Sequence, residues 1–307
     1  MAASAPGKLI LFGEHAVVFG EPALSTAINL RVEVFARPNP TWLADGSSID
    51  EPRYRYVKAA IGKAKLAKPQ WIEIRSMVPS GSGLGSSAAV TVATLGAIHG
   101  NLSSFDVPTI AREAFEVEHE VQGRASPIDT STASAGGGVL VLREPKADLL
   151  WSLERDTRRW FLHRANLPEL DLVIGNTGIS AATGPLVAKV KERVERDPNA
   201  GAMIREIGQI TLDGLAAIRR TDLVEVGRLM DRNHALLTQL GVGHPMLDRL
   251  VKAARPSSYG AKLTGAGGGG SIVAVTDRPQ ETAEALRAAG GKAFIVRPDP
   301  VGVTRQP

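Results

Sequence analysis

Residues 78–90 read Val-Pro-Ser-Gly-Ser-Gly-Leu-Gly-Ser-Ser-Ala-Ala-Val, with a glycine at every second position from Gly81 to Gly85. Before this stretch, residues 71–75 alternate apolar and polar side chains, which predicts a half-buried strand. After it, residues 88–95 contain neither proline nor glycine, which favours a buried helix. Glycine lets the backbone approach a ligand closely, and the first N–H groups of a helix have no partner within it. The stretch therefore predicts a loop that binds an anion, above all a phosphate.

Two common phosphate motifs do not fit this loop. A Walker A loop needs a Lys-Ser/Thr pair after its glycines, and none follows here. The dinucleotide fingerprint has the spacing GxGxxG, whereas these glycines have the spacing GxGxG. The spacing alone also allows a flexible Gly/Ser turn, although it favours this interpretation less. The string Gly-Leu-Gly-Ser-Ser-Ala-Ala at 83–89, however, resembles the phosphate loop of the GHMP kinases, the family of galactokinase, homoserine kinase, mevalonate kinase and phosphomevalonate kinase.

Length and composition narrow the class of protein. At 307 residues the chain is long enough for two domains with separate cores. Its 36 basic and 32 acidic residues are scattered, with no basic stripe interleaved with aromatics, so we expect no nucleic-acid partner. The net charge of +4 favours anionic substrates. Because cysteine is absent, disulfides, thiolate metal sites and a cysteine nucleophile are excluded.

The chain shows no targeting or membrane signal. Lys8, Glu14 and His15 interrupt the apolar run near the N-terminus, unlike the uncharged core of a signal peptide. No uncharged apolar run approaches the length of about 18 residues that a membrane span needs. We therefore expect a cytoplasmic protein without a membrane partner, and a homodimer is left open.

A second motif opens the chain. Residues 6–18 read Pro-Gly-Lys-Leu-Ile-Leu-Phe-Gly-Glu-His-Ala-Val-Val, a strand that turns at Gly13. From the pattern alone, Lys8 could extend to the surface and His15 could be a hydrogen-bonded core histidine. The segment resembles the first GHMP motif in its mevalonate-kinase form. Galactokinases usually follow Glu-His with Thr-Asp, and phosphomevalonate kinases commonly have Gly-Glu-Tyr.

The best-delimited helix lies between Asp106, which can cap its start, and Gly123, which can end it. Glu113, Glu118 and Glu120 flank its apolar stripe, and periodicity does not choose among them. In mevalonate kinases, a glutamate eleven residues before the catalytic aspartate helps to bind magnesium. The resemblance assigns that role to Glu118.

Residues 125–138 read Ala-Ser-Pro-Ile-Asp-Thr-Ser-Thr-Ala-Ser-Ala-Gly-Gly-Gly. A Pro-x-Asp turn followed by small residues predicts a loop, in which Asp129 could simply be a cap or Asx-turn residue. The stretch also resembles Ser-Gly-x-Asp-x-x-x-Ser-x-x-Gly-Gly of mevalonate kinases, whose aspartate acts on the substrate hydroxyl. Pro-Ile replaces the usual Gly-Val but leaves the aspartate and the glycines in register. The resemblance therefore implies that Asp129 is catalytic.

The second half of the chain carries a third motif. Residues 143–159 are mostly polar and predict irregular structure, and we place the domain boundary near Ala165. Residues 262–271 formally contain GxGxxG, but an apolar strand follows instead of a helix, so a dinucleotide site is excluded. The stretch resembles the third GHMP motif, a glycine loop that reaches back towards the phosphate site. Ser271 stands where many relatives have cysteine, a replacement that we expect to be silent.

Three motifs in family order imply the GHMP kinase fold, which is α+β. Residues 1–165 would form a domain similar to ribosomal protein S5 domain 2, and residues 166–307 a ferredoxin-like domain. The implied activity is phosphorylation of the primary hydroxyl of mevalonate by ATP with Mg²⁺, giving 5-phosphomevalonate and ADP in isoprenoid biosynthesis. Phosphorylation of phosphomevalonate or of another small alcohol such as galactose is the alternative within the class. A catalytically silent sensor is the alternative outside it.

The resemblance also implies how the reaction is carried out. Asp129 would accept the proton of the hydroxyl, and Lys8 would stabilise the growing negative charge and pair with Asp129 in the empty site. Glu118 would hold magnesium together with Ser86 or Ser87.

The remaining candidates bind the substrate and the nucleotide. Glu14 and His15 are candidate substrate contacts from the first motif. Residues 176–183 resemble the segment with which mevalonate kinases approach their substrate, which adds Thr183. The residues expected to bind ATP are Ser76, Gly81, Ser82, Gly83, Leu84, Gly85, Ser86, Ser87 and Gly267.

Overall fold

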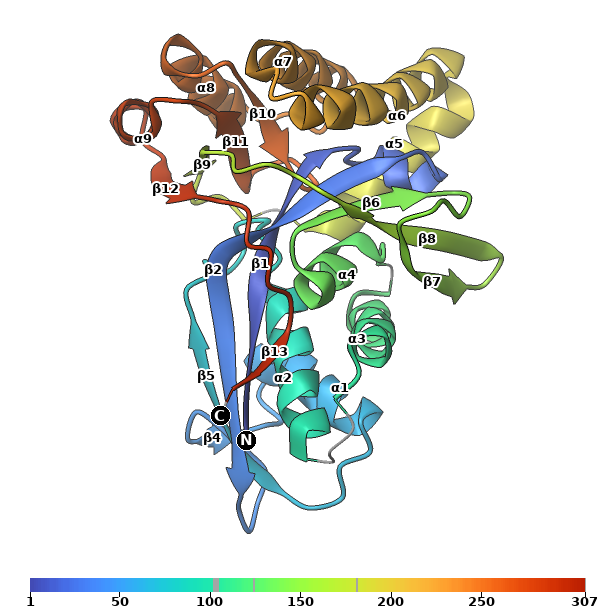
Figure 1. Cartoon of the computed structure of the whole chain (residues 1–307), viewed down its shortest axis with the longest axis vertical. Coiled ribbons are helices and arrows are strands. Elements are labelled where there is room, and N and C mark those ends of the chain that lie inside the picture. Colours follow the sequence, from blue (N-terminus) through green and yellow to red (C-terminus); the bar gives the residue numbers. More distant parts are fainter. Residues whose placement is uncertain (102–104, 124, 181, 307) are drawn as a thin grey trace.

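The computed structural model describes residues 1–101, 105–123, 125–180 and 182–306. Ala181, which belongs to the segment predicted to approach the substrate, lies outside these ranges. The described chain contains two β-sheets with helices packed on them, which confirms the predicted α+β class (Figure 1).

The first half is built on a nine-stranded sheet. Its strands are β1 (Ala2–Phe12), β2 (Ala23–Pro38), β3 (Leu43–Ala44), β4 (Ser47–Ser48), β5 (Gln70–Ser76), β6 (Gly138–Leu142), β7 (Leu149–Arg155), β8 (Arg158–Ala165) and β13 (Thr304–Gln306). They follow the order β4-β3-β5-β2-β6-β8-β7, and β1 pairs with β2 and β13. Strand β2 connects the two sides of the sheet, because it pairs along its length with β1, β5 and β6.

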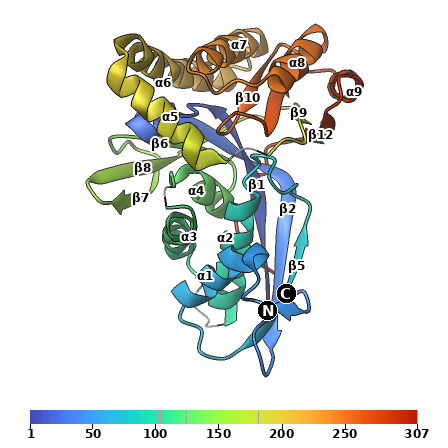
Figure 2. The ribbon, with the colours of Figure 1, turned by 180° about the vertical axis from the view of Figure 1, so that it is seen from behind.

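Four helices pack together beside β1 and β2 in both views (Figures 1 and 2). They are α1 (Arg55–Lys63), α2 (Ser86–Asn101), α3 (Val107–Gln122) and α4 (Ile128–Ala135), and two short 3₁₀ turns, η1 (Ala16–Phe19) and η2 (Pro52–Tyr54), precede them. The predicted limits of α3 are confirmed: the Asp106 carboxylate accepts a hydrogen bond from the Thr109 N–H, and Gly123 ends the helix with a φ of 72°. Helix α2 starts directly after the glycine-rich loop and runs through the core.

The second half contains a four-stranded antiparallel sheet in the order β10-β11-β9-β12. Helices α7, α8 and α9 pack on this sheet, while α6 contacts both α7 and β1 of the first half. The elements are β9 (Leu172–Asn176), α5 (Thr183–Arg196), α6 (Pro198–Arg219), α7 (Leu223–Gln239), α8 (Pro245–Ala254), η3 (Arg255–Ser257), β10 (Gly260–Thr264), β11 (Ser271–Val275), α9 (Pro279–Ala288) and β12 (Lys292–Val296).

The C-terminal segment returns to the first half of the molecule. Strand β8 of the first sheet ends at Ala165, and the second sheet begins with β9 at Leu172. After β12, however, the chain crosses back, and β13 pairs antiparallel with β1. On the way, the N–H of Val303 donates to the carbonyl of Ser134 at the end of α4, at 3.0 Å. We therefore assign residues 297–306 to the first half rather than to the second.

Two local predictions are wrong. The prediction of irregular structure over residues 143–159 holds only as far as residue 148, because β7 and β8 form a hairpin whose charged tip masks the strand pattern. Trp160 of this hairpin packs edge-on against Phe115 of α3, with ring centroids 5.7 Å apart. Asp129 lies not in a loop but in the first turn of α4. This short helix has no side-chain cap, and it is stabilised by packing against α2 and α3, which a local turn signature does not report.

Candidate active site

The three motifs meet at a cavity of about 1200 Å³. Its lining comes from β1, the loop before α2, the facing sides of α3 and α4, the start of α5 and the loop between β10 and β11. Of the predicted site residues, it includes Lys8, Glu14, His15, Gly81, Ser82, Gly83, Gly85, Ser86, Ser87, Glu118, Asp129, Thr183 and Gly267. Elements that are remote in sequence thus contribute to one site.

The glycine-rich loop has the backbone geometry of an anion cradle. Gly81, Gly83 and Gly85 have φ values of 69°, 78° and 74°, while Ser82 and Leu84 between them do not adopt positive φ. Such alternation turns successive N–H groups towards one concave side. The loop then leads directly into the N-terminus of α2, where further N–H groups are unpaired.

Three carbonyl groups of the loop accept hydrogen bonds from Lys8 and Ser271. The carbonyl of Leu84 accepts the backbone N–H of Lys8 at 2.9 Å, and the carbonyl of Gly83 accepts Lys8 Nζ at 3.1 Å. The carbonyl of Ser82 accepts the hydroxyl of Ser271 at 2.7 Å. Three consecutive carbonyls therefore have fixed partners.

The side chains of three predicted ATP-binding residues stabilise the conformation of the loop. The Leu84 side chain is fully buried in the core, so only its backbone can face a ligand. The hydroxyl of Ser82 donates to the carbonyl of Pro79 at 2.6 Å. Ser76 does not line the cavity; its hydroxyl donates to the carbonyl of Val78 at 3.0 Å and shapes the turn that enters the loop. These side chains therefore shape the loop, and contact of their residues with ATP stays a prediction.

The predicted ion pair between Lys8 and Asp129 is present, with Lys8 Nζ 2.9 Å from Asp129 Oδ2. The Lys8 side chain is 3% exposed, whereas the Asp129 side chain is 27% exposed to the cavity. Lys8 reaches Asp129 and the phosphate loop simultaneously, because its Nζ also donates to Gly83. One buried ammonium therefore contacts both the candidate base and the loop.

Glu118 lies in the same cluster, buried on α3. Burial and, to a lesser extent, the negative charge of Asp129 raise the pKa of its carboxyl to about 8, against the opposing effects of Lys8 and of hydrogen bonds from Gln122 and Ser87. A buried carboxyl beside a second carboxylate is the arrangement that a divalent cation would neutralise. Mg²⁺ is commonly held by one or two carboxylates together with substrate phosphates. No cluster of three His, Cys, Asp or Glu that could hold a metal alone occurs in the described part of the chain.

Glu14 does not present its carboxylate to the cavity. Its Oε1 forms an ion pair with Lys262 Nζ, and its Oε2 accepts Asn233 Nδ2 at 3.1 Å. Both side chains of the ion pair are 0% exposed. This carboxylate therefore joins the first motif to the third, and the substrate contact expected of Glu14 stays a prediction. Lys262 was not predicted as part of the site, although a lysine within the apolar strand of the third motif requires a buried partner.

His15 does offer a free acceptor. Its backbone has a φ of 60°, and its Nε2 hydrogen-bonds to the carbonyl of Ala266 at 2.9 Å. Burial lowers the pKa of the imidazole, so the ring is neutral with its proton on Nε2. Nδ1 is buried and has no hydrogen-bond partner among the described residues. His15 thus combines a place in the cavity lining with a ring acceptor that lacks a partner.

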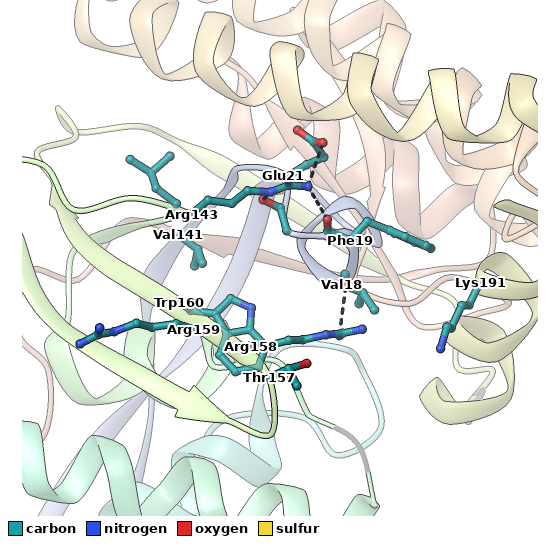
Figure 3. A pocket seen from close by; sticks show the side chains of 12 residues that line it. Val18, Phe19, Glu21, Val141, Arg143, Thr157, Arg158, Arg159, Trp160 and Lys191 are labelled. Atoms are coloured by element: carbon teal, nitrogen blue, oxygen red, sulfur yellow. Dashed lines mark hydrogen bonds and ion pairs between the residues drawn. The ribbon is translucent and has the colours of Figure 1, made fainter. Parts of the chain in front are cut away.

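The turn that follows His15 is fixed by two arginines (Figure 3). Arg143 donates from Nε to the carbonyl of Gly20 and from Nη2 to the carbonyl of Phe19, both at 2.6 Å. Arg158 donates to the carbonyl of Val18 at 3.1 Å. These contacts satisfy the last carbonyls of η1. The two arginines also line a second cavity of about 470 Å³ beside the main one. Arg158 and Lys191 line both spaces and bring positive charge to the cavity wall.

Thr183 and Gly267 complete the site. Thr183 is exposed at the start of α5. Gly267 has a φ of 81° and lies so close to Val242 that a Cβ atom there would be 2.1 Å from the Val242 carbonyl oxygen. The histidines of the second half are structural: His234 contacts Asp248 and the Leu263 N–H, and His244 caps α8.

Comparison with known proteins decides the family. Residues 54–138 match the GHMP kinases N terminal domain, and residues 215–295 match the GHMP kinases C terminal domain. The chain belongs to the GHMP kinase family. It is 37% identical to a mevalonate kinase of Archaeoglobus fulgidus over 99% of both chains, and 37% identical to one of Pyrococcus horikoshii over 96% of this chain and 94% of the other.

Solved structures agree with this membership. The GHMP kinase fold superimposes on the crystal structure of the Methanococcus jannaschii mevalonate kinase with a TM-score of 0.79 at 27% identity, covering 97% of this chain and 98% of that one. For the L. major mevalonate kinase in complex with R-mevalonate, the TM-score is 0.83 at 26% identity, covering 97% of this chain and 96% of that one. Within the described residues, no helix is long and apolar enough to cross a membrane. As a kinase of this family, the protein uses ATP.

Proposed function

We propose that this GHMP kinase transfers the γ-phosphoryl group of ATP to the primary hydroxyl of mevalonate, giving 5-phosphomevalonate and ADP. The observation that carries the proposal is the cluster of Lys8, Asp129 and Glu118 beside the glycine-rich loop. A silent sensor would not need a buried lysine between an acid and a phosphate loop. Relatives that match nearly the whole chain are named mevalonate kinase, and they support mevalonate as the alcohol.

The loop and α2 would bind the phosphates of ATP. Phosphoryl transfer depends mainly on positioning and on stabilising charge. The N–H groups of residues 81–85 and of the first turn of α2 supply fixed positive dipoles for that purpose. Gly267 lets the second glycine loop come close to the same cavity.

Asp129 would accept the proton of the substrate hydroxyl. A carboxylate with a pKa near 4 is far too weak a base to ionise an alcohol in advance, so it takes the proton as the O–P bond forms. Lys8 stabilises the negative charge that develops on the transferred group, because its ammonium already lies between Asp129 and the phosphate loop. The proton and the charge are thus handled by neighbouring side chains.

Glu118, with Ser86 or Ser87, would hold Mg²⁺. These residues provide carboxylate and hydroxyl oxygens, the ligand types that Mg²⁺ prefers. When bound, the ion would neutralise phosphate charge near the transferred group. Glu118 is suited to this role because burial and the neighbouring Asp129 disfavour its ionised form. A bound cation would stabilise that form.

The substrate would lie between η1 and α5. The free Nδ1 of His15 can accept a hydrogen bond from a hydroxyl of mevalonate, and the hydroxyl of Thr183 is within the same cavity wall. Arg158 and Lys191 line the cavity and are cations of the kind that would attract the carboxylate of mevalonate. Glu14 takes no part in this contact, since its carboxylate is paired with Lys262.

The test is a substrate panel. ADP release is measured with mevalonate, phosphomevalonate, galactose and homoserine at saturating ATP and Mg²⁺. We expect kcat/KM for mevalonate to exceed that for phosphomevalonate at least about a hundredfold, or roughly 2.7 kcal/mol of transition-state binding. A preference for phosphomevalonate or galactose would contradict the substrate while leaving the family unchanged, and no turnover with any alcohol would favour the sensor.

A further inference from the structure

The orientation of the phosphate loop depends on where its carbonyls point. In a trans peptide, the C=O of one residue and the N–H of the next point in opposite directions. The partners of the Ser82, Gly83 and Leu84 carbonyls therefore fix the directions of the following three N–H groups, each of which points away from the partner of its own peptide. Lys8 supplies two of these partners and Ser271 supplies the third.

Ser271 is well placed to fix one peptide. It opens β11, and its side chain is fully buried. The amide Nδ2 of Asn176 donates to Ser271 Oγ at 3.1 Å, which occupies a lone pair of the hydroxyl. The hydroxyl proton is then left for the carbonyl of Ser82, 2.7 Å away. Because Asn176 also donates to the carbonyl of Gly270, this direction is built into the sheet of the second half.

We propose that Ser271 is a positioning residue for the phosphate loop. Its hydroxyl fixes the peptide between Ser82 and Gly83, so that the N–H of Gly83 faces a bound phosphate instead of rotating away. Unlike Lys8, it has no contact with Asp129, so it acts on nucleotide binding and not on proton transfer. A cysteine at this position would be a weaker donor, and the replacement that we expected to be silent therefore affects the loop.

The alternative is that Ser271 only fills a buried polar site. Ser257 is a matched control, because it is also buried in the second half and its hydroxyl also lies within hydrogen-bond distance of two protein groups. Its partners, Ala254 and Thr282, lie outside the phosphate loop. Ser257→Ala therefore reports the cost of losing a buried hydroxyl without any effect on the loop.

The experiment measures binding of the ATP analogue AMPPNP by titration calorimetry, together with the KM values for ATP and mevalonate. For Ser271→Ala we expect the Kd of AMPPNP and the KM for ATP to rise about tenfold, the effect of one lost hydrogen bond, with the KM for mevalonate within about twofold. Ser271→Cys should give an intermediate Kd, and Ser257→Ala a wild-type Kd despite a similar loss of thermal stability.

The proposal is overturned if Ser271→Ala binds AMPPNP as the wild type does, or if Ser257→Ala weakens binding equally. If Ser271→Ala does not fold, Ser271→Cys decides, and wild-type affinity in that variant also overturns the proposal. The inference rests on the proposed function only in taking ATP as the ligand. AMPPNP binding needs no second substrate, so failure with mevalonate would not be mistaken for failure of this proposal.

Discussion

Replacing Glu14 by glutamine tests whether this residue joins the two halves or binds substrate. The substitution keeps the shape of the side chain and removes the charge that faces Lys262. In the wild type, both members of this ion pair are fully buried, and Lys262 Nζ also donates to the carbonyl of Leu263. Glu14→Gln therefore leaves a buried ammonium with neutral acceptors only.

The expected loss of stability can be worked out from these contacts. Removing one partner of a buried ion pair costs about 3–5 kcal/mol, because the other charge stays buried. The NH₂ group of the new glutamine could also face the NH₂ group of Asn233. Asn233 Oδ1 has no hydrogen-bond partner in the described structure, so rotating the Asn233 amide by 180° would relieve that clash. We therefore expect the lower end, about 3 kcal/mol.

The loss should depend on pH in a defined direction. Burial lowers the pKa of Lys262 from 10.5, and Glu14 raises it. Without Glu14, the folded-state pKa of Lys262 falls further below the unfolded value, so the unfolded state binds more protons between these two values. Stability then rises with pH, by at most about 1.4 kcal/mol per unit for one proton. The deficit relative to wild type should be larger at pH 7 than at pH 9.

The assay is urea unfolding of Glu14→Gln, Lys262→Met and the double variant, with steady-state kinetics on the same preparations. The double variant should recover most of the loss, since a neutral buried pair leaves no unpaired charge. The KM for mevalonate should stay within about twofold at temperatures where Glu14→Gln is folded. A loss below about 1 kcal/mol together with a tenfold rise in this KM would refute the reasoning and return Glu14 to the substrate contacts.

Three further substitutions test the remaining roles. Asp129→Asn should lower kcat by about 10²–10⁴ in single-turnover assays, with AMPPNP affinity almost unchanged, because a positioned proton acceptor is lost and the phosphate loop is kept. Glu118→Gln should raise the Mg²⁺ concentration that gives half-maximal rate, and an unchanged Mg²⁺ profile would make it an ordinary buried acid. Gly85→Ala should lower kcat/KM for ATP more than about tenfold, since its Cβ would lie 2.6 Å from Lys8 Cγ at a φ of 74°, whereas Gly62→Ala, with open space around it, should be neutral in the same assay.

Local features were predictable where one residue decides the structure. Asp106 and Gly123 limit α3 because each capping residue bonds to a backbone group only three or four positions away. Such local interactions can be predicted from the sequence. The contact between Lys8 and Asp129 was predicted from the family resemblance rather than from pattern. Composition and periodicity alone left both residues with structural alternatives.

Long-range features were not predictable, because the sequence shows that a charge needs a partner but not which one. Glu14 stands in an apolar segment, and its partner Lys262 is 248 positions further along the chain. The helical state of Asp129 depends on packing of α4 against α2 and α3, which no local propensity encodes. The return of the C-terminal segment to β1 is likewise a property of the assembled sheets.

The phosphate loop owes its orientation to both halves of the molecule. Lys8 holds the carbonyls of Gly83 and Leu84 from the first half, and Ser271 holds the carbonyl of Ser82 from the second. An ammonium has three donors, and the protein contacts to Asp129 and Gly83 leave one for a phosphate oxygen. A shift of the halves relative to each other would therefore change the loop and the charge beside Asp129 together. The buried pair of Glu14 and Lys262 resists such a shift, because it crosses the same boundary without using any group that the reaction needs.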